Sequence, residues 1–280
     1  MKAAVIVSRN DNYGGNLHNR ARICLDNLSS VFDAVVVVDW KCVNNISLLE
    51  AMKYYKSNVY NIKITKDFLQ QKYPNLLQYP IVETIGRNIG IRKAIDIGMQ
   101  WVCSTNIDIM MEHFNEQLLG EDTLYTARKR HIPQDVYEST KFNFSNILET
   151  KDNLRRQGYA SRDGQALWDP GDIWSIAICC GDFQLAHKDL WMQIRGFEEE
   201  MVGRGFADSN LMKRPILIGK KADELDIGVF HLDHGRESTK QADEHLPEND
   251  RILYVNNFAK SSNTENWGMH GDLSSENYFI

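Results

Sequence analysis

The chain has 280 residues, of which 42% are hydrophobic, so it is long enough for one large α/β domain or two small ones with an ample core. Its 32 basic and 38 acidic side chains give a formal net charge of −6 without long blocks of one sign, which argues against nucleic acid as a partner. The apolar runs are far shorter than the ~20 residues of a membrane span, and no signal peptide pattern precedes the first run, so we expect a cytoplasmic protein without a membrane span.

An alternation of apolar strands and amphipathic helices begins at the N-terminus. Residues 3–8 form a continuous apolar run, and residues 17–28 then carry apolar side chains at helical spacing. A second apolar run at 34–39 is followed by a helical pattern at 46–53 and a strand pattern at 58–64. This order predicts an α/β fold with a mostly parallel sheet, in which ligands bind beyond the carboxyl ends of the strands.

The second half of the chain has weaker patterns. A helix is predicted over 90–99, and it leads into an apolar strand that ends at Asp108. The polar stretch 128–172 predicts an insertion of loops and short helices outside the central sheet. The remaining elements are predicted as a strand over 173–179, a helix over 188–195 and a strand over 226–232.

Polar residues follow several of the expected strands. Arg9, Asp11 and Asp39 therefore lie where a ligand would bind in a parallel sheet. Asn106 and Asp108 form an N-x-D pattern whose two oxygens can turn to the same side of a hard divalent cation. An Asx turn that closes the strand would produce the same pattern.

Three further residues have two interpretations each. His231 and His234 follow an apolar strand, where one imidazole could complete a mixed nitrogen and oxygen metal shell or serve a structural role. Asp208 follows a glycine-rich turn at the expected start of a helix. That position suits a helix N-cap, and it also suits a general base held rigidly at a cleft.

Four motifs, in order along the chain, resemble those of nucleotide-sugar glycosyltransferases with the GT-A fold. Ser8-Arg9-Asn10 resembles the nucleobase loop after the first strand, and Val36–Asp39 resembles the second strand with its terminal Asp. Arg87–Ala94 is similar to the N-x-G-x-x-x-A helix start, and Asn106–Asp108 falls at the D-x-D metal motif. Asn106 replaces the first Asp of that motif, whereas Asp108 keeps the position of the direct metal ligand.

The stretch from Gly181 to Arg214 resembles a galactosyltransferase-type pattern, G-G-F-D/E followed by G-x-G-x-E-D-x-D-L-x-x-R. Ala207, Asp208 and Asn210 stand at its three acidic positions. In inverting members the acidic pair supplies the catalytic base, so the resemblance leaves Asp208 for that role.

The resemblance also assigns the metal ligands beyond this stretch. The position of His234 resembles that of the metal-binding His in the β-1,4-galactosyltransferases. His231 is at the position where that group has a second, weaker metal ligand.

The resemblance implies a GT-A (Rossmann-like) fold with a mostly parallel sheet flanked by helices in a single domain. We expect this domain over 1–255, with a nucleotide-binding half at 1–110, an acceptor and catalytic half at 173–235, and a C-terminal tail at 256–280 packed on the body. The implied activity is metal-dependent, inverting transfer of a hexose or N-acetylhexosamine from a UDP-sugar to a hydroxyl of a glycan, glycolipid or glycoprotein.

The implied site residues fall into four groups. The base is Asp208, and Mn²⁺ or Mg²⁺ is held by Asp108, His234 and His231. The nucleotide is bound by Ser8, Arg9, Asn10, Asp11, Asp39, Arg87 and Asn106. The sugars are bound by Gly181, Asp182 and Trp174, although a core position for the tryptophan explains its residue type equally well.

Two other classes of protein share some of these sequence features. A nucleotidyltransferase or Rossmann oxidoreductase would use the same strand ends, but neither G-x-G-x-x-G nor a P-loop follows the first strand. A non-catalytic nucleotide-sugar or carbohydrate-binding protein on the same fold would explain the departures at Asn106, Ala207 and Asn210.

Overall fold

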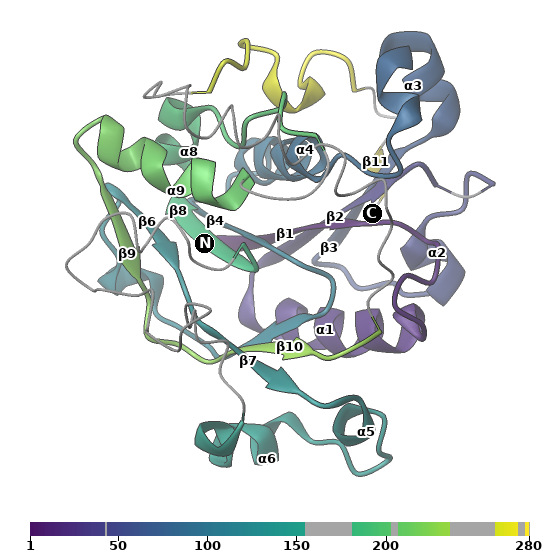
Figure 1. Cartoon of the computed structure of the whole chain (residues 1–280), viewed down its shortest axis with the longest axis vertical. Helices are drawn as coiled ribbons and strands as arrows, with labels where there is room; N and C mark the ends of the chain where they lie inside the picture. The colour runs from purple at the N-terminus through teal and green to yellow at the C-terminus, as the bar shows by residue number, and fades with distance from the viewer. Residues whose placement is uncertain (43, 155–180, 203–206, 236–260, 274–277, 280) are drawn as a thin grey trace, which may run out of the picture.

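The computed structural model of the chain describes residues 1–42, 44–154, 181–202, 207–235, 261–273 and 278–279. Figure 1 shows a central sheet with helices on both faces. The strands of this sheet, in chain order, are β1 (Lys2–Ser8), β2 (Ala34–Trp40), β3 (Val59–Ile64), β4 (Trp101–Thr105), β6 (Thr123–Thr126), β8 (Phe183–His187), β9 (Lys221–Glu224) and β11 (Tyr278–Phe279).

Within the described ranges, these strands form an eight-stranded sheet in the order β11-β3-β2-β1-β4-β8-β6-β9. Strands β3, β2, β1 and β4 pair in parallel, whereas β8 runs antiparallel to both β4 and β6. The register places Ser8 beside Asp39 at the carboxyl edge of the parallel strands. The predicted α/β fold with a parallel centre is confirmed, although the sheet is mixed at its two sides.

A second, three-stranded sheet has the order β5-β10-β7, with β5 (Ile109–Met111), β7 (Lys129–Ile132) and β10 (Val229–Leu232). Strand β7 lies in the stretch 128–172 that the sequence placed in loops and short helices, so that prediction was wrong for β7. Strand β7 is short, and its first three residues are lysine, arginine and histidine. The alternation of apolar and polar residues that indicates a strand is therefore absent.

Most helices cover the two faces of the central sheet, whereas the two helices within residues 134–149 lie beside the small sheet (Figure 1). Their bounds are α1 (Leu17–Val31), α2 (Leu48–Met52), α3 (Lys66–Lys72), α4 (Glu83–Asp96), α5 (Gln134–Tyr137), α6 (Phe144–Glu149), α8 (Lys188–Ile194) and α9 (Ala207–Leu217). Short 3-10 helices are η1 (Pro74–Gln78), η2 (Glu116–Leu118), η3 (Lys151–Asn153) and η4 (Trp267–Met269). No helix in the described ranges has the length and apolar character needed to cross a bilayer.

The alternation of side chains along β1 and β2 divides the core into two layers. Val5 and Val36 pack with residues of α4, whereas Ile6 and Val37 pack on the opposite face with residues of α1. Both layers are almost free of solvent contact. The parallel strands are therefore covered on both faces, as their continuous apolar sequences predict.

Helix α4 begins earlier than the sequence indicated, at Glu83 rather than at residue 90. Two glycines explain the difference. Gly86 and Gly90 pack so closely on the sheet that a Cβ atom at either position would overlap Val7 or Val5, respectively. Residues 84–91 of α4 are moreover all buried, polar Arg87 and Asn88 included, so the apolar period of the helix is weak in the sequence.

The C-terminal segment packs on α4 through one buried amide. The side chain of Asn88, on α4, accepts a hydrogen bond from the Phe197 N–H at 2.8 Å and donates to the Phe197 carbonyl at 2.9 Å. It also donates to Glu199, which accepts the N–H of Gly268 in η4 at 2.7 Å. Trp267 is buried beside them. The expected strand 173–179 and residues 256–260 of the expected tail lie outside the described residues.

We expect Asn88→Ala to lower the free energy of unfolding by about 1–3 kcal/mol, because the buried N–H of Phe197 loses its acceptor. Chemical denaturation measures this change. The matched control is Asn146→Ala, which removes an exposed amide from α6 and should shift stability by less than about 0.5 kcal/mol. Equal stability of the two variants would contradict the structural role of Asn88.

Candidate functional site

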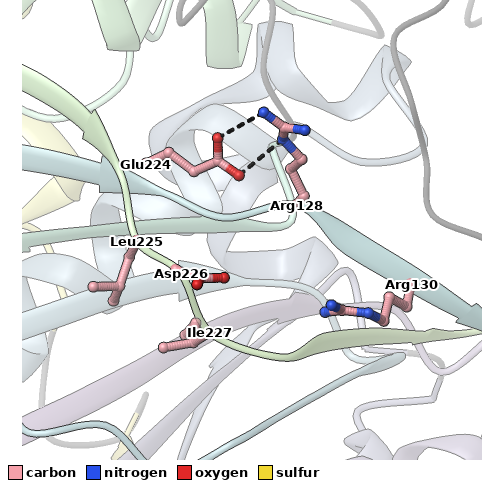
Figure 2. Close-up of a pocket in the computed structure, with 6 residues that line it drawn as sticks. All are labelled: Arg128, Arg130, Glu224, Leu225, Asp226 and Ile227. Atoms are coloured by element: carbon pink, nitrogen blue, oxygen red, sulfur yellow. Dashed lines mark hydrogen bonds and ion pairs between the residues drawn. The ribbon is translucent and has the colours of Figure 1, made fainter. Parts of the chain in front are cut away.

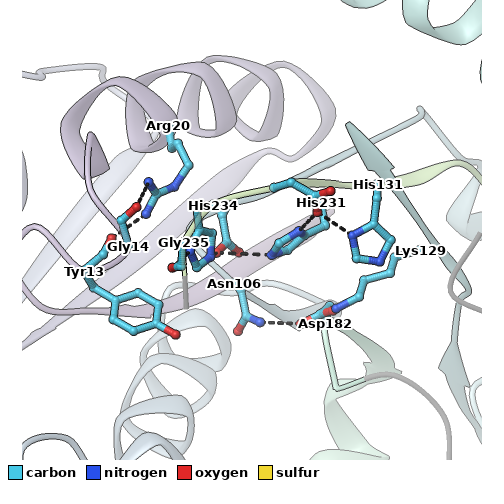
Figure 3. Close-up of polar contacts among 12 residues, drawn as sticks. Tyr13, Gly14, Arg20, Asn106, Lys129, His131, Asp182, His231, His234 and Gly235 are labelled. Carbon is cyan, nitrogen blue, oxygen red and sulfur yellow. Dashed lines mark hydrogen bonds and ion pairs between the residues drawn. The ribbon is translucent and has the colours of Figure 1, made fainter. Parts of the chain in front are cut away.

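A buried carboxylate and two imidazoles meet where β4 ends and the small sheet begins. Asp108 lies between β4 and β5, and its residue is only 8% exposed. Its Oδ2 lies 3.0 Å from His234 Nε2 and 3.6 Å from His231 Nε2. The Leu232 N–H donates to the Asp108 carbonyl at 2.9 Å, which fixes β10 beside this carboxylate. Figure 3 shows the rings of His231 and His234 side by side.

The electrostatics of this cluster keep Asp108 ionised. Burial by itself would raise the pKa of Asp108, but hydrogen bonds and charge from His231 and His234 outweigh burial and hold the pKa well below its usual range. Burial lowers the pKa of His231, and Asp108 more than compensates, so that this pKa lies above its ordinary value. The cluster is therefore a stable anionic centre with two basic neighbours.

These three residues fit a divalent metal ion. Asp108 Oδ1 is buried and, within the described part of the chain, has no hydrogen-bond partner. One ligand atom from each of Asp108, His231 and His234 lies within 4.8 Å of the others. A carboxylate oxygen with two imidazole nitrogens is a donor set that suits Mn²⁺ and related cations. The sequence-predicted metal ligands are thus brought together.

The loop before α1 closes one side of this cluster. Gly14 has a φ of +68° and lies against the His234 ring so closely that a Cβ atom there would overlap it. Tyr13 meets the same ring edge to face, with 5.3 Å between ring centroids. The fully buried Arg20 donates to the carbonyls of Tyr13, Gly14 and Gly15, which fixes the loop (Figure 3). Sequence reasoning missed Tyr13, Gly14 and Arg20.

A chain of polar contacts continues from Asn106 to β7. Asn106 Oδ1 accepts from Arg87 at 2.5 Å, and its Nδ2 donates to Asp182. The second oxygen of Asp182 accepts from Lys129, and Thr105 donates to the Asp182 carbonyl at 2.6 Å. An aspartate at position 106 could not donate to Asp182, so the departure from D-x-D has a chemical reason. Asn106 and Arg87 thereby support the site rather than the metal.

Asp208 lies beside this network. Its carboxylate packs against Gly181, where a Cβ atom would come within 2.9 Å of Oδ2, and it accepts from the Ser209 N–H at 3.0 Å. Burial is the main cause that raises its pKa, with a further contribution from the charge of Asp182, whereas Arg87 lowers it. The structure therefore brings Asp208, Gly181 and Asp182 together. A carboxylate with a raised pKa is a stronger proton acceptor than an ordinary aspartate.

The residues of the β1 loop have mostly local partners. Arg9 pairs with Asp11, and Asn10 Oδ1 lies 2.9 Å from His18 Nε2. Ser8 is 4% exposed.

Asp39 is fully buried, and its carboxylate accepts the N–H of Leu48 at the start of α2. Burial raises the pKa of Asp39 to about 7, against the opposing effect of the Leu48 hydrogen bond. Its Oδ1 has no partner among the described residues.

Three other residues of the stretch from Gly181 to Arg214 are structural. Arg214 donates to Asn210 at 2.6 and 2.8 Å and to Glu198 at 3.0 Å, and all three side chains are buried. Glu198 also accepts from Ser262 at 2.7 Å, so this group ties α9 to the C-terminal segment. Trp174 and Gly203, which the sequence also singled out, lie outside the described residues.

A pocket of about 340 Å³ has a lining that includes none of Asp108, His231 and His234 (Figure 2). It is lined by Arg128, Arg130, Glu224, Leu225, Asp226 and Ile227. Because side chains alternate along β7, Arg130 points away from the face that carries Lys129 and His131. Arg128 forms two contacts with Glu224, at 2.8 and 3.1 Å. This pocket therefore belongs to the opposite side of the small sheet.

No protein-family model and no curated protein sequence matches the chain. Among solved structures, the chain is similar to GalNAc-T7 with UDP, GalNAc and Mn²⁺, with a TM-score of 0.58 and 12% identity. The match covers 90% of this chain and 48% of that one, so the chain spans about half the length of that protein. At this identity the likeness shows the fold alone, and the predicted GT-A-like fold is confirmed.

We expect Asp39→Asn to be more stable than the wild type, and more so as the pH rises. The folded state holds the Asp39 proton up to about pH 7, whereas an unfolded aspartate releases it near pH ~4, so the wild type loses stability between these values. An amide has no proton to lose, and the expected gain at pH 8 is about 1–3 kcal/mol.

Denaturant titrations of both proteins at several pH values measure this difference. Asp223→Asn, at an exposed carboxylate on β9, controls for the loss of one negative charge. A stability difference between Asp39→Asn and the wild type that stays constant from pH 4 to pH 8 would contradict the prediction.

Proposed function

We propose that this protein is a metal-dependent glycosyltransferase that moves a hexose or N-acetylhexosamine from a UDP-sugar to a hydroxyl group of a glycan, glycolipid or glycoprotein. The observation that carries the proposal is the buried, partnerless Oδ1 of Asp108 beside the Nε2 atoms of His231 and His234. This group lies at the carboxyl edge of parallel strands, where α/β folds bind ligands. The fold is similar to that of a glycosyltransferase solved with UDP and Mn²⁺.

Asp108, His231 and His234 would hold Mn²⁺ or Mg²⁺. When bound, such an ion neutralises negative charge that develops on a diphosphate leaving group. Gly14 and Tyr13 keep His234 in place from the other side, and Arg20 holds their loop. The chain thereby presents a rigid set of ligands, which lowers the reorganisation needed on binding.

Asp208 is the proposed general base. The acceptor hydroxyl attacks the anomeric carbon, its proton passes to the Asp208 carboxylate, and the bond from the anomeric carbon to the diphosphate oxygen breaks as UDP leaves. The raised pKa of Asp208 supports this role, because proton acceptance is most efficient when the pKa approaches the working pH. Attack from the face opposite the diphosphate inverts the anomeric centre.

The remaining predicted residues extend this proposal. The proposed nucleotide-binding residues are Ser8, Arg9, Asn10, Asp11 and Asp39, at or after the ends of β1 and β2, together with Arg87 and Asn106. Asn106, which Arg87 holds, also donates to Asp182, and Asp182 with Gly181 and Trp174 is assigned to the sugars. The non-catalytic alternative loses two of its arguments, since Asn106 bridges Arg87 to Asp182 and Asn210 holds Arg214.

The first test is a thermal-shift and hydrolysis screen with a panel of nucleotide sugars, with and without Mn²⁺. A ligand that binds only the folded state raises the melting temperature. At a ligand concentration of 100 times the Kd, the free energy of unfolding rises by about 2.7 kcal/mol. We expect a Mn²⁺-dependent shift with one UDP-sugar and slow release of UDP. Binding without hydrolysis or transfer to any acceptor would favour the non-catalytic alternative.

We expect Asp208→Asn to reduce kcat by about 10²–10⁴-fold, because the amide cannot accept the proton of the acceptor hydroxyl. The affinity for the UDP-sugar and Mn²⁺ should stay within about threefold of the wild-type value. Asp189→Asn, at an exposed position at the start of α8, is the matched control and should leave kcat unchanged. Equal turnover by Asp208→Asn and the wild type would exclude Asp208 as the base.

Gly14→Ala and Gly15→Ala form a matched pair that tests the metal ligands. Both residues have positive φ values, of 68° and 71°, so alanine costs about 1 kcal/mol of backbone strain at either position. Only the methyl group at position 14 overlaps His234, because a Cβ at Gly15 meets no described atom within 4 Å.

We therefore expect weaker Mn²⁺ binding by Gly14→Ala and nearly wild-type binding by Gly15→Ala, measured from the electron paramagnetic resonance signal of free Mn²⁺. Equal Mn²⁺ affinities of the two variants would show that His234 is not a ligand.

A further inference from the structure

His231 lies between two carboxylates, and each of its ring nitrogens faces one of them. Nε2 faces Asp108 Oδ2 at 3.6 Å, and Nδ1 lies 3.1 Å from Asp233 Oδ1. Asp233 is partly buried, and its N–H donates to the Ile132 carbonyl at 2.9 Å, which fixes the backbone that carries this carboxylate. The proposed metal ligands therefore account for one side of His231 and leave the Asp233 side unexplained.

A third imidazole reaches the same carboxylate oxygen. His131 Nδ1 lies 2.5 Å from Asp233 Oδ1, and its ring meets that of His231 edge to face with 5.2 Å between centroids. The parallel register of β7 and β10 pairs His131 with His231, so both side chains lie on one face of the small sheet. Figure 3 shows the rings of His131 and His231 near each other, each with a dashed contact.

We propose that Asp233 and His131 form a positioning pair that holds His231 with its Nε2 directed at the metal position. The inference rests on the proposed function only for the identity of the bound group, a divalent cation. Neither residue touches the cation in this assignment, and both act through the ring of His231.

The chemistry of the carboxylate gives the direction of the effect. An ionised carboxylate only accepts hydrogen bonds, so His231 and His131 both donate their Nδ1 protons to Asp233. When the Nδ1 of His231 keeps a proton, the lone pair on Nε2 is available to a cation. Loss of such a carboxylate partner from a metal-binding histidine typically costs 10- to 100-fold in metal affinity.

The register of β7 with β10 places His131 where it also holds Asp233. Two imidazole donors on one oxygen fix the position of Asp233 more closely than one donor would, because the carboxylate cannot turn without losing both contacts. The Tyr137 hydroxyl also donates to the Asp233 carbonyl, at 2.8 Å. Removal of His131 should therefore weaken metal binding in the same direction as removal of Asp233, by a smaller factor.

The first experiment measures Mn²⁺ binding by the full chain without any nucleotide. We expect a Kd about 10- to 100-fold higher for Asp233→Ala, a smaller increase for His131→Ala, and partial recovery in Asp233→Asn, which keeps one acceptor oxygen. The control is Asp226→Ala, which removes an exposed carboxylate on the far side of the small sheet. Melting temperatures of the metal-free variants separate a general loss of folding from a change at the site.

The second experiment reads the ring of His231 directly, by ¹H–¹⁵N spectra of histidine-labelled protein with diamagnetic Mg²⁺ and without metal. We expect the wild type to keep the proton on Nδ1 and Asp233→Ala to lose this preference. A proton on Nε2 alone in the wild type would overturn the proposal, as would an unchanged Mn²⁺ affinity in a folded Asp233→Ala variant.

The two experiments also separate this inference from the proposed function. If no UDP-sugar supports transfer, the proposed function is wrong. The Mn²⁺ affinities of the variants and the position of the His231 ring proton would still test the role of Asp233. If the wild type does not bind Mn²⁺, the proposed cation site is wrong. Spectra of the metal-free protein would still show whether Asp233 fixes the ring of His231.

Discussion

Asp108 is an ionised carboxylate in a position with little access to water, and the arrangement of the site follows from the need to compensate its charge. Two imidazoles from the end of β10 supply that compensation, at 3.0 and 3.6 Å. A buried charge without such partners would cost several kcal/mol, so the small sheet must dock where it does. The loop of Gly14, which leaves room for His234, and Arg20, which holds that loop, depend on this docking.

The central sheet provides the rigid base on which these contacts are made. Its parallel strands are covered on both faces by apolar layers, and α4 approaches through glycines. The polar residues of the site lie on strand ends, on the small sheet, and on the helices α1, α4 and α9 that border them. Asn106 and Asp182 join the two regions, because their hydrogen bonds link Arg87 on α4 to Lys129 on β7. A carboxylate at 106 would break that link by placing two acceptors against each other.

The sequence predicted the strands that are buried on both faces, because continuous apolar runs are a clear signal. Strand-end Asp108, His231 and His234 each had two interpretations, and the family resemblance selected them as metal ligands. The sequence did not predict β7 or the role of His131, since alternation of Lys129 and His131 with Arg130 has no apolar period. Asp233 was inside a recognised motif, but only the register of β7 with β10 reveals its function. Asp39 illustrates the reverse case, because its place at a strand end was foreseen, whereas its complete burial and its bond to Leu48 depend on packing.

The contacts that assemble the site join parts of the chain that are distant in sequence. The Asp108–His234 pair closes a loop of 126 residues, and the His131–Asp233 pair closes one of 102. Closing loops of this length costs conformational entropy, and the packing of β10 against β5 and β7 offsets this cost. The cluster is therefore complete only when the ends of β4 and β10 lie side by side. A cation that needs all three side chains would therefore bind only the folded chain. Its binding would shift the folding equilibrium toward the folded state.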